Sequence, residues 1–131
     1  MGRKKSEEKH LSGCEAMIMK LIWDYDGDIP VQELMERLRT QFRKDYKRTT
    51  VATFLTRLSE KGYAETYRKG HLSYAHALRS EEEYRERLLH DETELWFDGS
   101  APELVMALTR VKKLSKADLE KIRSILDELD H

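Results

Sequence analysis

Residues 47–78 read KRTTVATFLTRLSEKGYAETYRKGHLSYAHAL, and they contain two different periodicities side by side. The apolar residues of the first half recur at helical spacing, at Val51, Phe54, Leu55 and Leu58. This spacing predicts a helix over about residues 48–61 with one buried face. Gly62 follows at the place where a glycine commonly ends a helix in the left-handed conformation. The residues on either side of Lys69-Gly70 alternate as in strands, which predicts a β-hairpin with a tight turn.

Two further helices are predicted upstream. The first begins at SGCE (Ser12 to Glu15), which matches the S-x-x-E capping box, and it ends in the glycine-containing segment DYDGD. The second begins near Pro30, a residue suited to a first helical position. The order helix, helix, helix, hairpin predicts a mainly α fold with a small β-hairpin, the winged helix-turn-helix.

The rest of the chain is predicted to be helical, with starts at Ser80, Pro102 and Ser115. A heptad-like stripe ends it, formed by Leu119, Ile122, Leu126 and Leu129. Three short helices cannot bury all their apolar residues alone, so we expect a homodimer; folding back onto the head is the alternative. The residues expected at the dimer contact are Leu88, Trp96, Leu104, Val105, Leu108, Leu119, Ile122, Leu126 and Leu129.

Charge is distributed unevenly along the 131 residues, although the formal net charge is only -1. Residues 1–79 carry 16 Lys and Arg against 11 Asp and Glu, whereas residues 80–131 carry 8 against 14. We therefore expect a disordered arm (1–10), a polyanion-binding head (11–79) and a helical dimerisation domain (80–131). The alternative, that the charges belong to two ordinary solvated surfaces, stays open, because such surfaces would give the same distribution.

The composition predicts a soluble cytoplasmic protein. Charged residues make up 37% of the chain, and no apolar run approaches the ~18 residues of a membrane span. The first ten residues have no signal-peptide core, so no membrane association is expected. The single cysteine, Cys14, fits a reducing compartment; it is interpreted as a packed small residue, with a redox switch as the alternative.

The predicted third helix has an unusual polar face, which we interpret as a DNA-recognition surface. Short side chains let the helix backbone approach base edges in the major groove, threonine hydroxyls hydrogen-bond to bases or phosphates, and methyl groups contact thymine. Basic residues at its start and in the hairpin can meet phosphates. The candidate DNA-binding residues are Lys47, Arg48, Thr49, Thr50, Ala52, Thr53, Thr56, Arg57, Arg68, Lys69 and His71.

The chain resembles the penicillinase-repressor family, the β-lactam-resistance repressors and their copper-responsive relatives. The resemblance is carried by LSGCEAMIMKLIW (Leu11 to Trp23), TTVATFLTRLSEKGY (Thr49 to Tyr63) and YRKGHLSYAHAL with the following RSEEEY. It extends more loosely over LVMAL and LSKADLEKIRSILDEL, to about residue 129. It implies a homodimeric transcriptional repressor that binds a dyad operator through its winged heads. In the antibiotic-responsive branch it also implies a sensor-protease that cleaves the C-terminal region.

Several positions depart from the family pattern. Ala16 stands where a tryptophan is usual, and Ala52 stands where some members have a basic residue. The site that matches the Asn-Phe scissile pair is about Ala107-Leu108. The cysteine cluster of the copper branch is absent from the sequence.

Enzyme and metal motifs are missing from the sequence: there is no phosphate-binding glycine loop, nucleophile elbow or metal-ligand spacing. We therefore expect a protein that is not an enzyme and that needs no cofactor or metal. The alternative function is a winged-helix module that binds another protein through the third helix rather than DNA.

Overall fold

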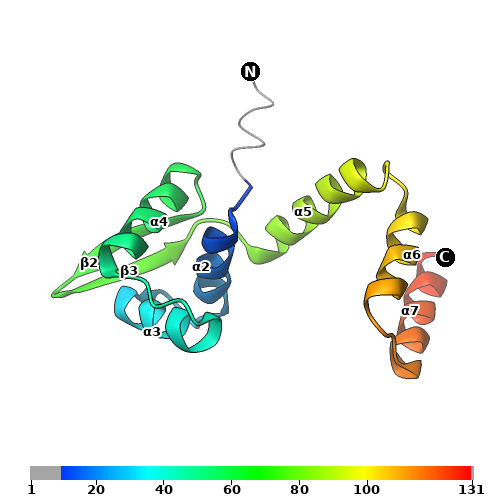
Figure 1. Ribbon diagram of the computed structural model, residues 1–131, viewed down its shortest axis with the longest axis horizontal. Coiled ribbons are helices and arrows are strands. Elements are labelled where there is room, and N and C mark those ends of the chain that lie inside the picture. The colour runs from blue at the N-terminus through cyan, green and yellow to red at the C-terminus, as the bar shows by residue number, and fades with distance from the viewer. Residues whose placement is uncertain (1–9, 131) are drawn as a thin grey trace, which may run out of the picture. The chain divides into compact units, whose positions relative to one another are not determined.

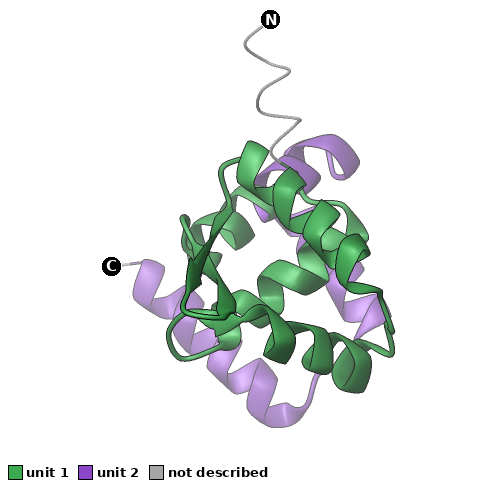
Figure 2. Ribbon diagram, turned by 90° about the vertical axis from the view of Figure 1, so that its left-hand side faces the viewer, with its two compact units in different colours: residues 1–88 green, residues 89–131 purple. Residues whose placement is uncertain are grey.

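The computed structural model describes residues 10–130, so nearly all of the arm predicted at residues 1–10 lies outside the described residues. The chain divides into two compact units, residues 1–88 and 89–131, drawn in different colours in Figure 2. The boundary between the units falls within one helix, α5.

The fold is mainly helical with a small sheet, as predicted (Figure 1). The first unit contains α2 (Gly13–Asp24), β1 (Ile29–Pro30), α3 (Val31–Phe42), α4 (Arg48–Glu60), β2 (Ala64–Lys69) and β3 (Leu72–Ala77). Helix α5 (Glu81–Trp96) begins there, and α6 (Ala101–Val111) and α7 (Lys116–Leu129) follow in the second unit. Helices α3 and α4 with the β2–β3 hairpin form the winged helix-turn-helix.

Two of the predicted helix ends, the start of α2 at Ser12 and the end of α4 at Gly62, are confirmed. The Ser12 hydroxyl accepts from the Glu15 amide at 3.2 Å, and the Glu15 carboxylate accepts from the Ser12 amide at 2.9 Å, which completes the capping box. Gly62 has a φ of 84°, and the next amide, that of Tyr63, donates to the Leu58 carbonyl at 2.9 Å. This pattern turns the chain sharply from α4 into the hairpin.

The sheet has three antiparallel strands in the order β1-β3-β2, one strand more than predicted. Ile29 pairs with Ala75 and Pro30 with Tyr74. Pro30 was expected at the first helical position; it is instead the extended N-cap residue of α3. Two residues are too few to show a strand periodicity, and their partner lies far along the chain.

The hydrophobic core lies between α2, α3, α4 and one face of the sheet. Its buried residues include Ile18, Met19, Leu21, Ile29, Leu34, Leu38, Val51, Leu55, Leu58, Tyr63 and Ala75. Phe54 was expected on the buried face of α4 but is only half-buried; its ring packs 5.6 Å from that of Tyr46 at the edge of the core.

One carboxylate, that of Glu15, is buried in this unit at 2% exposure. The Lys61 ammonium lies 2.7 Å from it and also donates to the His10 carbonyl at 3.1 Å. Burial alone would raise the pKa of Glu15, but the hydrogen bonds from Lys61 and Ser12 and the charge of Lys61 outweigh burial and lower it. The pair therefore joins the start of α2 to the end of α4.

Helices α5, α6 and α7 contain no buried residue. Their large exposed apolar side chains are Leu89, Leu95, Trp96, Val105, Met106, Leu108, Val111, Leu119, Ile125, Leu126 and Leu129. None of the helices described combines the length and the apolar character that a bilayer crossing requires.

Candidate nucleic-acid interface

The polar face of α4 points away from the core. Thr49, Ala52, Thr53, Thr56 and Arg57 are exposed, and Thr50 is half-buried. The buried residues of α4 lie on its opposite face. The fold thus brings the five exposed candidate residues of α4 together on its solvent-facing side, with Thr50 at the edge.

The first turn of α4 is positively polarised. Its N-cap residue, Lys47, makes no side-chain capping hydrogen bond, and the first turn contains no acidic residue. A helix N-terminus carries partial positive charge and exposed amides, to which Lys47 and Arg48 add two formal charges. The Arg48 guanidinium donates to the Gln32 side chain of α3 at 3.3 Å, which links the two helices of the helix-turn-helix.

Two of the threonine hydroxyls already have partners within α4. Thr53 donates to the Thr49 carbonyl and Thr56 to the Ala52 carbonyl, both at 3.0 Å. The hydroxyl proton is used in these bonds, while the oxygen lone pairs and the methyl group remain for a ligand. In this arrangement the threonines suit thymine methyl groups or amino donors on bases better than phosphate oxygens.

The wing is a hairpin whose two faces differ. Lys69 pairs with Leu72 across a turn formed by Gly70 and His71, and Gly70 has a φ of 67°. This turn lies one residue further along than predicted. Because side chains alternate along a strand, Arg68 lies on the core-facing side together with Thr66, whereas Lys69 lies on the opposite side.

A groove of about 290 Å³ separates α4 from the wing. It is lined by Val31, Arg48, Ala52, Leu55, Thr56, Thr66, Tyr67, Arg68 and Ser73. Two arginines and several small polar side chains face it, and none of these lining residues is acidic. A basic, acid-free groove between a recognition helix and a wing is suited to a nucleic-acid backbone.

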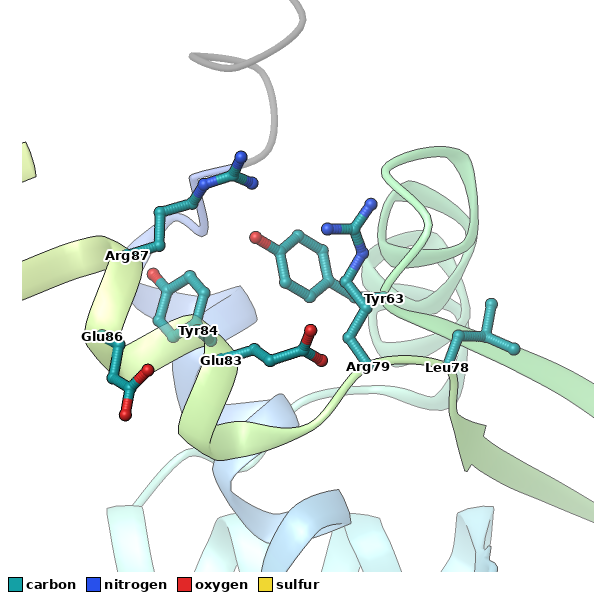
Figure 3. Close-up of a pocket in the computed structure, with 7 residues that line it drawn as sticks. All are labelled: Tyr63, Leu78, Arg79, Glu83, Tyr84, Glu86 and Arg87. Atoms are coloured by element: carbon teal, nitrogen blue, oxygen red, sulfur yellow. The ribbon is translucent and has the colours of Figure 1, made fainter.

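A larger hollow, of about 660 Å³, lies where the first turns of α5 meet the head (Figure 3). The Arg79 guanidinium lies 5.2 Å from the centre of the Tyr63 ring, and the Arg79 Nε donates to the Gly62 carbonyl at 3.1 Å. Arg79 and Arg87 are matched there by two carboxylates, those of Glu83 and Glu86. The hollow therefore has no net formal charge, unlike the groove, and does not favour a polyanion.

Sequence reasoning missed the contributions of Thr66, Tyr67 and Ser73 to the groove, and of Gln32 to the position of Arg48. Strand alternation is a signal that could have identified Thr66, because it shares the face of Arg68. Cys14 contacts the Tyr46 hydroxyl at 2.9 Å, and no group of three or more His, Cys, Asp or Glu among residues 10–130 could hold a metal ion.

The architecture described above is that of a winged helix-turn-helix regulator. The penicillinase repressor family matches residues 11–128, and the chain belongs to this family. Among curated proteins, the methicillin resistance regulatory protein MecI of Staphylococcus aureus (strain N315) is 23% identical over 118 residues, which cover 90% of this chain and 94% of the relative. MecI of Staphylococcus epidermidis is similar to the same extent. Membership of this family identifies the chain as a transcriptional repressor.

Proposed function

We propose that the protein is a sequence-specific repressor that binds a dyad operator as a homodimer, with one winged head on each half-site. The observation that carries the proposal is the basic, acid-free groove between α4 and the wing, beside the outward threonine face of α4. The alternative, a protein-binding winged helix, would be better served by exposed apolar residues on α4, and that face contains none larger than Ala52.

In the proposed complex, α4 enters the major groove with its N-terminal turn nearest the bases. The small side chains of Thr49, Ala52 and Thr53 allow a close approach and read base edges. Lys47 and Arg48 meet phosphates at the start of the helix, and Arg68 and Lys69 meet phosphates through the wing. Phosphate contacts fix the position of the head, and the threonine face supplies the sequence preference.

We propose further that residues 80–131 form the dimerisation domain. Helices α6 and α7 bury none of their apolar residues in the single chain, and Leu126 and Leu129 are 58% and 77% exposed. An apolar surface of this extent in a soluble regulator indicates contact with a second copy. Two copies also supply the twofold symmetry that a dyad operator requires.

DNA binding is tested by incubating the purified full-length protein with a random duplex library, sequencing the retained fragments, and measuring affinity for the selected duplex at several salt concentrations. We expect a palindromic consensus and a steep fall in affinity as salt rises. Retention of no consensus, or binding that is insensitive to salt, would favour the protein-binding alternative.

Dimerisation is tested by sedimentation of two full-length variants, each of which introduces one negative charge into α7. Leu126→Glu places the charge on the apolar stripe and should give a monomer that binds the full operator much more weakly. Ser124→Glu adds the same charge at an exposed position outside the stripe and should remain dimeric. If Leu126→Glu sediments as a dimer, the stripe is not the dimer contact.

A further inference from the structure

The Asp28 carboxylate connects the loop before β1 to both strands of the wing. It immediately precedes β1, and the register that pairs Ile29 with Ala75 brings Asp28 beside His76 of β3. Its Oδ1 lies 2.8 Å from His76 Nδ1, and its Oδ2 accepts from the Tyr67 hydroxyl of β2 at 2.5 Å. A single side chain outside the hairpin thus holds both of its strands.

These side-chain contacts lie on the sheet face opposite that of Thr66 and Arg68, although Tyr67 also borders the groove. Tyr67 pairs with Tyr74 and Glu65 with His76 across the two strands, so these side chains share a face that alternates with the face of Thr66 and Arg68. The Tyr67 and Tyr74 rings stack with their centres 5.5 Å apart. Asp28 therefore contacts the wing on the face that carries Tyr67 and His76, whereas the face that carries Thr66 and Arg68 is directed toward α4.

Contacts that anchor the wing matter because most of β2 is exposed. Strand β1 contributes only two residue pairs, at Ala75 and Tyr74, and β2 is exposed from Glu65 to Lys69. A two-stranded hairpin that extends beyond its core is marginally stable by itself. Side-chain bonds to Asp28 reduce the freedom of the hairpin to bend relative to α4.

The groups in this cluster influence one another's protonation. The hydrogen bond to Asp28 raises the pKa of His76 and outweighs the opposing effect of burial, and the charges of Asp28 and Glu65 add smaller contributions in the same direction as the hydrogen bond. The hydrogen bond from Tyr67 and then that from His76 lower the pKa of Asp28, and the bond to Asp28 raises the pKa of Tyr67 to about 12. The charged His76–Asp28 pair is therefore complete below the ordinary pKa of histidine and is lost as pH rises through the raised pKa of His76.

We propose that Asp28 is a positioning residue for DNA binding: it fixes the wing against the recognition helix through Tyr67 and His76, so that operator affinity depends on Asp28 and on the protonation of His76. The inference rests on the proposed DNA-binding function. It predicts that removal of Asp28 weakens DNA binding. Removal of an acidic residue from a DNA-binding head ordinarily strengthens binding, because it reduces repulsion.

The test compares Asp28→Ala with Asp26→Ala in the full-length protein. Asp26 lies in the same loop, is exposed, and carries the same charge. Both variants are made in a His71→Gln background, which removes the histidine of the wing turn from both proteins. At pH 6 we expect Asp28→Ala to bind the selected operator roughly fivefold more weakly, as for loss of a charge-assisted hydrogen bond, and Asp26→Ala to bind equally well or slightly better.

The pH profile separates positioning from a general loss of stability. In the background protein, affinity should fall between pH 6 and pH 8.5 as His76 loses its proton, and in Asp28→Ala this inflection should move to lower pH. If Asp28→Ala binds as tightly as Asp26→Ala, or keeps the same inflection, the proposal is overturned.

A second readout needs no DNA and therefore distinguishes failure of this inference from failure of the proposed function. The pKa of the His76 ring, followed by nuclear magnetic resonance, should lie above that of an exposed histidine and should fall in Asp28→Ala. Amide hydrogen exchange in β2 and β3 should also become faster in this variant, while exchange in α3 stays unchanged. Unchanged exchange in the hairpin would refute the support role even if the protein binds DNA as proposed.

Discussion

The salt dependence of operator binding measures how many phosphates the head neutralises, and the structure predicts its size. Five basic side chains of each head belong to the proposed interface: Lys47, Arg48, Arg57, Arg68 and Lys69. With one phosphate for each, a dimer neutralises about ten, and at ~0.9 counterions per phosphate the slope of log K against log salt is about -9. Replacing Arg68 and Lys69 by alanine removes four phosphate contacts from the dimer and gives a slope of about -5.

The difference is large enough to measure by fluorescence anisotropy with a labelled operator. Between 0.1 and 0.2 M salt, affinity should fall about 500-fold for the unmodified protein and about 40-fold for the double variant. The matched control replaces Lys20 of α2 and Arg39 of α3, which removes the same charge outside the proposed interface and should leave the slope near its original value. Sequence preference should survive in all of these proteins, because phosphate contacts carry no base information.

The two single variants test the two faces of the wing separately. Arg68 shares the groove with α4, whereas Lys69 lies on the other strand face. If both meet phosphates, each single replacement flattens the slope by about 2 per dimer. An unchanged slope in the double variant would refute the contribution of the wing and leave α4 to bind alone.

Substitutions at two further positions, Lys61 and Thr53, test the head itself. Lys61→Met leaves the buried Glu15 carboxylate with only the Ser12 hydrogen bonds, and should lower stability by about 2 kcal/mol and the Tm by about 10 °C near pH 7. The pKa of Glu15 is lowered in the folded head, so the stability that the Glu15–Lys61 pair supplies is lost as pH falls through that pKa. The difference in stability between Lys61→Met and the unmodified protein should therefore shrink at pH 3. An equal difference at both pH values in thermal denaturation would contradict this account. Thr53→Ala should change base preference at one position of each half-site by roughly 1 kcal/mol. Thr53→Val should retain the preference if the methyl group makes the contact. Uniform weakening across all sequences in the selection profile would show a phosphate contact instead.

Local signals in the sequence were sufficient for the helices and the hairpin. The periodicity around Val51 and Leu58 lies entirely within α4, and Gly62 has the backbone conformation that its position predicted. The capping residues Ser12 and Ser115 act within three residues of their partners. Features of this kind are visible without knowledge of the tertiary fold, which explains why their prediction succeeded.

Features that depend on register between distant segments could not be read in the same way. Strand β1 is defined by two residue pairs with β3, about 45 residues further along the chain. The segment that contains Asp24, Asp26 and Asp28 reads only as a helix-ending loop, and nothing local distinguishes its third aspartate from the others. Only the pairing of Ile29 with Ala75 places Asp28 beside His76.

The resemblance to the antibiotic-responsive repressors implies release by proteolysis, and the structure bears on where such cleavage is feasible. The pair expected at the scissile site from the resemblance, about Ala107-Leu108, lies inside α6, which runs from Ala101 to Val111. Proteases cut exposed, locally opened chain, and a peptide bond held in a helix becomes accessible only when that helix opens. No residue of α6 is buried in the single chain, so opening is inexpensive there, but the proposed dimer contact would cover Leu104, Val105 and Leu108 and oppose it. Cleavage at this pair therefore requires both a protease that accepts alanine and leucine in place of Asn-Phe and a monomer or loosened dimer as its substrate.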